Sequence, residues 1–592
     1  MAHVRITKQR IMRLIPFILM MAASFCPAVE IPAGGVELIT TQEKTTAWTG
    51  TVGHAEKVSV DGQDFSQAMR ITVDKASPEQ PWNAQLATPL TTGPVKSGDK
   101  LLITYMARCP VEKEGLAMAK VQLKTPPHDM LGITENARIG TAWQAVHQVI
   151  VAKLDAPEGT AELAIFLGEQ TQTVEIANVR VLNYGPDFDI TKLPRQKDTY
   201  EGRGPGAPWR KAALERIESI RKADFSIRLR GKDGAPLANT AVEIELDRHE
   251  FGFGTCVTRG MLTMEGPDGD RYRDIVRRTC SRVVFENDLK PDTFPHDTQG
   301  KAELEKSMAW LEANGISIRG HYLMQEAVDG WTRERLADPA KAREALLASS
   351  RERIAAIGDR VTEWDVINHP IAWKGAEMLG QKGPPLDGVG MEIFREARQL
   401  TNLPLCINED QIFRPGPQQD KTYELLEKLK RDGVRVDGLG NQAHFHSSYL
   451  PSPEELLRVT DHFTSVVPKQ VITEFDIATN GDDQLAADYL RDSMIACFSH
   501  PAYDGFLLWG FWENRHWIPE AALWKKDWTP KPAALVWEEW LCENWHTKET
   551  LVSDADGRVS WRGFKGSYKV KTGARVTAPF QPGKTSEIVI PD

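Results

Sequence analysis

The sequence predicts a multidomain chain in which an all-β jelly-roll sandwich precedes a (β/α)8 TIM barrel and a small β-rich tail follows it. Its length of 592 residues corresponds to three or four domains. Residues 30–186 contain short strand-like segments separated by turn residues, a pattern typical of a sandwich. Downstream, apolar strand-like runs alternate with amphipathic segments over residues 251–545. This alternation indicates β-α units around a parallel sheet.

The barrel prediction depends on the number and spacing of the apolar runs. Successive runs start 31 to 46 residues apart, and segments such as KAELEKSMAWLEANG lie between them. Eight such units are typical of a (β/α)8 barrel. A doubly wound open sheet is disfavoured, because no glycine-rich phosphate loop follows the first run. The runs begin near Phe251, Arg282, Ser317, Glu363, Leu403, Gly438, Gln470 and Gly505.

The first 28 residues have the pattern of an export signal. A basic region is followed by an apolar run, Leu14 to Phe25, which is short for a bilayer span, and cleavage is expected near Ala28. An uncleaved anchor is the alternative. We therefore expect export to the periplasm, the cell surface or the medium, with no membrane span in the mature protein. The six cysteines beyond this segment are too widely spaced to indicate a zinc site or a disulfide-dense scaffold.

The remaining boundaries follow from changes in periodicity. Residues 187–207 are rich in glycine, proline and charge, which predicts a linker. A helix and a β-rich lead-in are expected over 208–250, before the barrel at 251–545. Residues 546–592 predict a small sheet packed on the barrel, with Asp556-Gly557 as a turn signal.

Composition excludes some partners. The net charge of −10 is spread along the chain without a basic block after the N-terminus, so nucleic acid is not an expected partner. The chain has 17 tryptophans, and core packing accounts for most of them, although flat indole rings also stack on sugars. A monomer is expected.

The predicted strand ends carry polar and aromatic residues of a kind that binds polyols. In (β/α)8 barrels the functional residues lie at the carboxyl ends of the strands. Amides and imidazoles can bind hydroxyl groups, carboxylates can cleave glycosidic bonds, and tryptophans can form walls. Together they indicate a polyol-binding cleft. The residues at these ends are Glu286, Asn287, Lys290, His321, Asn368, His369, Asn408, Glu409, Asp410, Gln442, His444, Glu474, Trp509, Trp512 and Trp517.

Between about Glu250 and Trp540 the sequence resembles glycoside hydrolase family 10, the β-1,4-xylanase family. The motifs that carry the resemblance are ENDLK, RGH, WDVIN, INED, DGLGNQAH, ITEFDI and WGFWENRHW followed by PKPA. The resemblance implies an endo-1,4-β-xylanase-like hydrolase that acts on xylan-type polysaccharide by a retaining mechanism and needs no cofactor. No metal site is expected, because His444 and His446 lack further ligands. A serine-triad esterase is disfavoured, because no Gly-x-Ser-x-Gly motif is present.

The resemblance also implies roles for individual residues. Glu474 matches the nucleophile that forms a glycosyl-enzyme intermediate. His444 matches the histidine that orients this nucleophile, and Gln442 would support the same strand end. The matches to sugar ligands and aromatic walls are Asn368, Glu286, Asn287, Lys290, His321, Trp509 and Trp517.

Two positions depart from the family pattern. His369 stands directly after Asn368, where the family has the glutamate that acts as general acid/base. Gln325 stands where the family has a tryptophan, and Glu326 follows it in place of a histidine. Three alternatives follow: His369 is the acid/base, another carboxylate donates the proton, or the cleft binds polysaccharide with little or no cleavage. The candidate carboxylates are Glu326, Glu409 and Asp410.

The N-terminal sandwich resembles the jelly-roll carbohydrate-binding modules that accompany such catalytic domains. The segment IFLGEQTQTVEIANVRVLNYG carries this resemblance, with LLITYMARC upstream. Trp82 and Trp143 are candidates for stacking on sugar, and core positions are an equal alternative. A module that binds the substrate would raise its local concentration by tethering.

Overall fold

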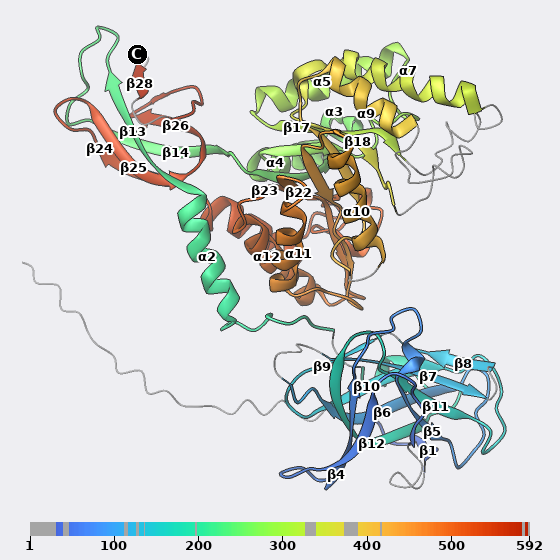
Figure 1. The fold of residues 1–592 in the computed structure, drawn as a ribbon. Coiled ribbons are helices and arrows are strands. Elements are labelled where there is room, and N and C mark those ends of the chain that lie inside the picture. Colours follow the sequence, from blue (N-terminus) through green and yellow to red (C-terminus); the bar gives the residue numbers. More distant parts are fainter. Residues whose placement is uncertain are drawn as a thin grey trace, which may run out of the picture.

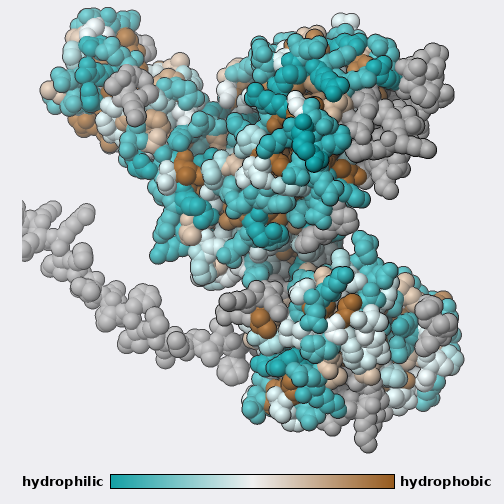
Figure 2. All heavy atoms as spheres, viewed as in Figure 1, coloured by the Kyte–Doolittle hydropathy of each residue, from teal (hydrophilic) through white to brown (hydrophobic). Residues whose placement is uncertain are grey.

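The computed structural model describes residues 31–589 apart from short gaps, and Figure 1 shows its N-terminal sandwich, central barrel and small β domain. The expected export signal and Glu326 therefore lie outside the described residues. None of the described helices is long and apolar enough to cross a membrane. Figure 2 shows a largely hydrophilic face with scattered apolar side chains. The gaps are residues 40–46, 112–116, 126–128, 135, 196–197, 326–338, 372–388, 415–416 and 583–585.

The N-terminal domain is a sandwich of two antiparallel sheets. One has the strand order β10-β6-β12-β4-β3, with β1 beside β12; the other has the order β2-β5-β11-β7-β8, with β9 beside β7. Alternating apolar residues of both sheets form one core, in which Leu101 and Ile165 are fully buried. The strands are β1 (Val36–Glu37), β2 (Ala47–Trp48), β3 (His54–Ser59), β4 (Gln67–Val73), β5 (Gln85–Pro89), β6 (Lys100–Arg108), β7 (Ala117–Thr125), β8 (Asp129–Ile133), β9 (Ala137–Ile139), β10 (Gln144–Val151), β11 (Glu162–Phe166) and β12 (Gln172–Asn183).

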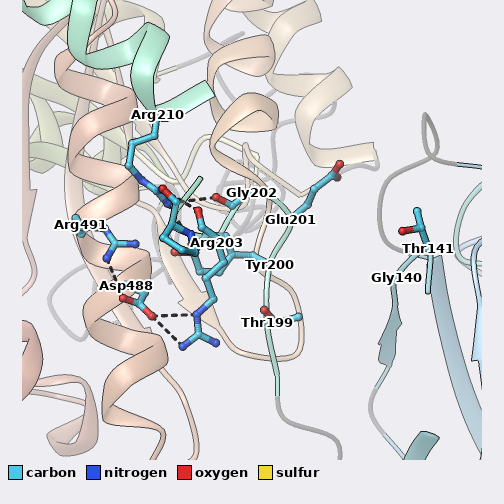
Figure 3. A pocket seen from close by; sticks show the side chains of 12 residues that line it. Gly140, Thr141, Thr199, Tyr200, Glu201, Gly202, Arg203, Arg210, Asp488 and Arg491 are labelled. Carbon is cyan, nitrogen blue, oxygen red and sulfur yellow. Dashed lines mark hydrogen bonds and ion pairs between the residues drawn. The ribbon is translucent and has the colours of Figure 1, made fainter. Parts of the chain in front are cut away.

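Part of the expected linker is packed against the barrel. The Tyr200 hydroxyl donates to Asp492 Oδ2 at 2.8 Å, and the Tyr200 side chain is buried. Arg203 donates to Asp488 Oδ2 at 3.0 Å, on the same helix α12 (Asp483–Phe498). Figure 3 shows these residues around a cavity of about 940 Å³, with Gly140 and Thr141 of the sandwich across from them. The chain then enters helix α2 (Pro208–Ile220), whose first turn is preset by Pro208.

The lead-in and the tail, which the sequence suggested as separate segments, form one small β domain. Lead-in strand β13 pairs with β25 and β28 of the tail, and β14 pairs with β24 and β26. Trp561 and Tyr568 of the tail pack with Phe225 of the lead-in. The strands are β13 (Lys222–Arg230), β14 (Ala241–His249), β24 (Lys548–Val552), β25 (Arg558–Phe564), β26 (Gly566–Thr572), β27 (Arg575–Val576) and β28 (Ser586–Val589).

The central domain is a closed barrel of eight parallel strands. Their order is β20-β19-β18-β17-β16-β15-β23-β22, and pairing of β20 with β22 closes it, which excludes the open doubly wound sheet. The short β21 extends the wall beside β22. The eight strands correspond to the eight runs of the sequence prediction. The strands are β15 (Gly252–Val257), β16 (Arg282–Phe285), β17 (Ser317–Gln325), β18 (Trp364–Asn368), β19 (Leu405–Glu409), β20 (Gly438–Asn441), β21 (His444–His446), β22 (Lys469–Ala478) and β23 (Tyr503–Leu508).

Amphipathic helices cover the outside of the barrel. Several begin with a side-chain cap, such as Asp297, which accepts from the Gly300 amide, and Ser452, which accepts from the Glu455 amide. These caps satisfy amide groups that the first helical turn leaves without intrahelical partners. The barrel helices are α3 (Arg259–Thr263), α4 (Pro267–Thr279), α5 (Thr298–Ala313), α7 (Pro339–Ile357), α9 (Val389–Leu400), α10 (Pro417–Arg431), α11 (Pro453–Thr464), α12 and α13 (Pro532–Glu539).

Candidate active site

The carboxyl ends of the barrel strands bring the predicted polar residues to one end of the barrel. Asn368 is the last residue of β18, and Glu286 follows β16 directly. Gln442 follows β20, and Glu474 lies within β22. Because the strands are parallel, their carboxyl ends meet at one rim, so residues distant in the sequence become neighbours.

Glu474 is a buried carboxylate held by two side chains. Its Oε1 accepts from Asn408 Nδ2 at 2.7 Å, and its Oε2 lies 3.3 Å from His444 Nε2. Burial alone would raise the pKa of Glu474. The hydrogen bond from His444 and the nearby imidazoles of His321, His444 and His369 outweigh burial and lower this pKa to about 2. Glu474 is therefore ionised at any ordinary pH, as a nucleophile requires.

Three amide side chains connect Glu474 to the end of β18. Asn368 Oδ1 accepts from Asn408 Nδ2 at 2.8 Å and from Gln442 Nε2 at 3.0 Å. The Asn368 Nδ2 group donates to Gln325 Oε1 at 2.9 Å. These bonds orient the Asn368 amide, and Gln325 now has a hydrogen-bonding role at the position where the family pattern has a tryptophan.

His444 lies between two carboxylates. Its Nδ1 lies 3.0 Å from Asp476 Oδ1 as an ion pair without hydrogen-bond alignment. Burial lowers the pKa of His444, but the charges of Asp476 and Glu474 and the hydrogen bond with Glu474 raise it well above its ordinary value. Asp476 Oδ2 also accepts from Trp517 Nε1 at 2.7 Å. The imidazole is thus held in its charged form beside Glu474, and Trp517 is fixed over the same residues with its indole 59% exposed.

His321 is supported from below by a buried ion-pair network. Its Nδ1 lies 3.0 Å from Asp365 Oδ2, and the Asp365 carboxylate also binds the guanidinium of fully buried Arg319. Burial raises the pKa of Asp365, but Arg319 and His321 lower it below its ordinary value. The other nitrogen of His321 lies 4.0 Å from Glu474 Oε1. This nitrogen faces the Glu474 carboxylate. The His321 ring also lies edge-on to the indole of Trp509, with 5.3 Å between the two ring centroids.

A second polar group follows β16, the strand next to β17. Lys290 Nζ donates to Asn287 Oδ1 at 3.0 Å and lies 5.9 Å from the Trp509 ring centroid. Burial raises the pKa of Glu286, and Lys290 partly offsets this. These three polar side chains and Trp509 form one wall of the cleft.

His369 takes the position directly after Asn368, with a left-handed backbone (φ 53°). Its amide donates to the Asn408 carbonyl at 2.9 Å. Its ring nitrogens lie 3.3 and 3.4 Å from Gln442 Nε2, and Nδ1 lies 3.9 Å from Glu409 Oε1. The ring is mostly buried, with 12% of its side chain exposed.

The structure disfavours Glu409 as a proton donor. Glu409 is fully buried, and its carboxylate accepts backbone amide bonds from Ile371 at 2.7 Å and Asp410 at 2.8 Å. These bonds fix the buried carboxylate in place, with its Oε1 3.9 Å from His369 Nδ1. Asp410 is partly exposed and lines a small cavity of about 90 Å³ with Gln442 and His444.

Asn408 and Asp476 have roles at the site that were not predicted from the sequence. Asn408 binds Glu474 and Asn368, and Asp476 binds His444 and Trp517. The role of Asp476 could have been predicted, because residues two apart in a strand lie on the same face, which places Asp476 beside Glu474 on β22. For Asn408 the signal was only an amide inside a buried strand. Among the described residues, no group of three His, Cys, Asp or Glu could hold a metal ion.

The two tryptophans proposed for sugar stacking in the sandwich differ in exposure. Trp82 is 48% exposed beside Phe166. Trp143 is half-buried against Phe65, and the Arg108 guanidinium lies 4.9 Å from its ring centroid. Trp82 thus has the more open face.

Taken together, the central domain is a (β/α)8 barrel whose strand ends carry a buried, ionised glutamate among imidazoles, amides and tryptophans. This arrangement defines the class of carbohydrate-active barrels. The chain belongs to glycosyl hydrolase family 10, whose family model matches residues 244–539.

Comparison with individual proteins adds relatives at low identity. The chain is 29% identical over 389 residues to the anti-sigma-I factor RsgI6 of Acetivibrio thermocellus, covering 64% of this chain and 49% of that protein. It is 23% identical over 584 residues to endo-1,4-beta-xylanase 1 of Arabidopsis thaliana, covering 92% and 56%. The chain thus spans about half the length of these relatives.

Solved structures of similar fold include xylanase 10B of Thermotoga petrophila in complex with xylobiose. That match has a TM-score of 0.44 and 21% identity, and it covers 50% of this chain and 95% of that one. The CBM22-1–GH10 modules of Clostridium thermocellum Xyn10B, complexed with xylohexaose, match over 86% and 97% of the two chains, with a TM-score of 0.41 and 13% identity.

Proposed function

We propose that this protein is a retaining glycoside hydrolase that acts on β-1,4-linked xylan-type polysaccharide, with Glu474 as its nucleophile. The observation that carries the proposal is the Glu474 carboxylate, kept ionised and oriented by Asn408 and His444 in a family 10 barrel. Several relatives with this domain are named endo-1,4-beta-xylanases. In the proposed reaction Glu474 attacks the anomeric carbon, and water later releases the sugar.

The flanking residues would bind the sugar during this reaction. Asn368 would bind the 2-hydroxyl, with its amide already oriented by Gln442 and Asn408. Glu286, Asn287, Lys290 and His321 would bind the glycone, with Trp509 and Trp517 as apolar walls. No cofactor is required for this chemistry, because carboxylate attack and proton transfer suffice.

His369 is the proposed proton donor in place of the usual glutamate. Its side chain is 12% exposed directly after β18, whereas Glu409 is fully buried and bound to backbone amides. A protonated imidazole would form an ion pair with Glu409, which lies 3.9 Å away. Proton donation to the leaving oxygen contributes roughly 10²–10⁴-fold to such reactions. Asp410 is the alternative donor within the described residues, since it also lies at the rim.

A second candidate function is polysaccharide binding without cleavage. The substitution at His369 favours it, because the usual acid/base carboxyl is missing while the sugar-binding residues remain. The similarity to an anti-sigma-I factor also favours binding without cleavage, because the name of that protein describes a regulatory role and not hydrolysis. In this case the same cleft would act as a glycan receptor.

Export and a monomeric state complete the proposal. The basic and apolar N-terminal segment supports export, as action on an extracellular polysaccharide requires. The N-terminal sandwich would serve as a carbohydrate-binding module that tethers the barrel to its substrate.

Hydrolysis by wild type and His369→Glu distinguishes these functions, with His54→Glu on the exposed β3 strand as a matched control. Each protein is tested on xylan and on an aryl xylobioside, whose leaving group needs little protonation. Cleavage of xylan by the wild type supports the enzyme. A wild type inactive on both substrates, with xylan cleavage only in His369→Glu, indicates a glycan receptor whose cleft is intact. Absence of both cleavage and xylan binding in all three proteins refutes the proposed function.

A further inference from the structure

A groove of about 960 Å³ runs between the sandwich and the barrel. On the sandwich side it is lined by residues of the β8–β9 and β10 regions, including Asn136 and His147. On the barrel side it is lined by the loops that follow β21 and β22, including His446 and Asn480. Both barrel loops lie at the carboxyl ends of their strands. The groove therefore opens on the same end of the barrel as Glu474.

Two contacts hold the sandwich beside this end of the barrel. The Arg138 guanidinium of β9 lies 5.1 Å from the ring centroid of Tyr449, and the Arg414 guanidinium lies 5.4 Å from the same ring. The packed linker provides the second contact, through Tyr200 and Arg203 on α12 (Figure 3). The sandwich thus contacts the barrel directly through Arg138, and the linker between the two domains is packed on α12.

The groove lies next to the small cavity beside His444, because the two share His446 as a lining residue. The small cavity beside His444, which binds Glu474, is also lined by His446 and Tyr449. His446 lines the larger groove as well. This path leaves the barrel at β20 and β21, whereas Glu286 follows β16. Three strands separate β16 from β20 in either direction around the barrel, so the path lies opposite the proposed glycone wall.

The groove contains buried polar atoms that lack a partner. His147 is 6% exposed, and its Nδ1 has no hydrogen-bond partner among the described residues. The same is true of Asn136 Oδ1. A buried polar atom without a partner is costly, so each is suited to a ligand that brings hydroxyl groups. The charged lining residues have both signs, Arg195 and Asp198 among them, which does not favour a strongly charged chain.

We propose that this groove is a distal sugar-binding subsite shared by the two domains. It takes the leaving-group side of a neutral β-1,4-linked polysaccharide whose other end occupies the barrel cleft. This inference rests on the proposed function, because it assumes that the cleft binds such a chain. His147 and Asn136 bind hydroxyls of the distant sugars, and the Arg138–Tyr449 contact holds the two walls together.

Binding as a function of chain length tests the subsite. The full-length chain with Glu474→Gln, which prevents turnover, is titrated calorimetrically with xylobiose and xylohexaose. The hexaose is expected to bind more tightly than the biose. His147→Ala and Asn136→Ala should each weaken xylohexaose binding roughly 3- to 10-fold, as expected for one lost hydrogen bond, and leave xylobiose binding unchanged. His54→Ala, on β3 outside the groove, is the matched control and should change neither.

The outcomes separate this inference from the proposed function. If xylohexaose binds equally well to His147→Ala, Asn136→Ala and the control, the subsite is refuted while the proposed function stands. If no xylo-oligosaccharide of either length binds, both are refuted. Tyr449→Ala provides an independent variant on the barrel side, because it leaves His147 and Asn136 intact but removes the ring that contacts Arg138. Tyr449→Ala should also reduce the gain in affinity from xylobiose to xylohexaose. An unchanged gain would count against a site shared by the two domains.

Discussion

The side-chain amide of Asn408 donates to Oε1 of Glu474 at 2.7 Å, although β19 and β22 are not neighbours in the barrel. The same Nδ2 group donates to Asn368 Oδ1 at 2.8 Å, and the side-chain oxygen Oδ1 of Asn408 accepts from Thr473 Oγ1 at 2.7 Å. Rotation of the Asn408 amide would break three hydrogen bonds. The orientation of Glu474 is therefore determined inside the barrel and not by solvent.

Asn408→Asp should shift the pH dependence of hydrolysis. A second carboxylate at 2.7 Å disfavours ionisation of Glu474 and raises its pKa, so the acid limb of kcat/KM should move to higher pH. Asn408→Ala should lower kcat/KM about 10²-fold through loss of orientation. The measurement is kcat/KM on an aryl xylobioside across pH. Asn441→Ala is the control, because Asn441 is a buried strand-end amide that donates to Gln470 and not to Glu474. An acid limb of Asn408→Asp that matches the wild type would contradict this prediction.

Glu474→Ala should abolish turnover and preserve binding. The substitution removes the proposed nucleophile, so kcat should fall roughly 10³-fold or more, while the amides and tryptophans still bind the sugar. Glu286→Ala should act in the opposite way and mainly weaken binding, because Glu286 follows β16 and is proposed to bind the glycone and not to attack it. Single-turnover rates and calorimetric affinities for xylobiose distinguish the two effects. A rate unchanged in Glu474→Ala would remove this residue from the mechanism.

The depressed pKa of Glu474 should make the protein less stable at acid pH. Its folded pKa of about 2 lies below the ordinary value of 4.5, so the carboxylate contributes stability at neutral pH. This contribution is lost as the pH falls from about 5 towards 2, because the unfolded chain then takes up the proton more readily. Over this pH window the free energy of unfolding should fall less in Glu474→Gln than in the wild type, by a few kcal/mol. Parallel denaturation curves for the two proteins from pH 6 to pH 3 would argue against the depressed value.

Asp476→Asn should lower the pKa of His444. The charge of Asp476 is the main influence that raises this pKa against burial, and the substitution removes it. The imidazole should then lose its proton closer to neutral pH, and the alkaline limb of kcat/KM should move to lower pH. Trp517→Phe is the matched comparison, because it removes the indole donor to Asp476 and keeps both carboxylates. If Trp517→Phe shifts the limb as far as Asp476→Asn does, the charge of Asp476 is not the cause.

Truncation after Trp545 should destabilise the chain well beyond the tail itself. Strands β13 and β14 would lose their partners β24, β25, β26 and β28 and expose open edges. A lower unfolding temperature and concentration-dependent aggregation are expected in calorimetry and light scattering. Trp561→Ala removes one buried ring between the two segments and should lower the unfolding temperature less than the truncation does. A truncated chain as soluble and as stable as the full one would contradict the shared domain.

The sequence predicted the eight barrel strands and most residues of the candidate site. Each strand is a local apolar run, and its last residues are polar because they reach the rim, so both features can be identified from a single segment. Asn368, Gln442, His444 and Glu474 were identified in this way. The role of Asn408 could not be, because a hydrogen bond across the barrel depends on which strands face each other.

The sequence by itself determined the order of the domains, the parallel barrel and the presence of His369 directly after Asn368. These depend on local periodicity and on residue identity. Only the tertiary structure decided that the lead-in and the tail share two sheets, that Tyr200 packs on α12, and that the sandwich and barrel enclose a groove. These features join segments that are distant along the chain. Their stability comes from long-range strand pairing and burial, which no single segment encodes.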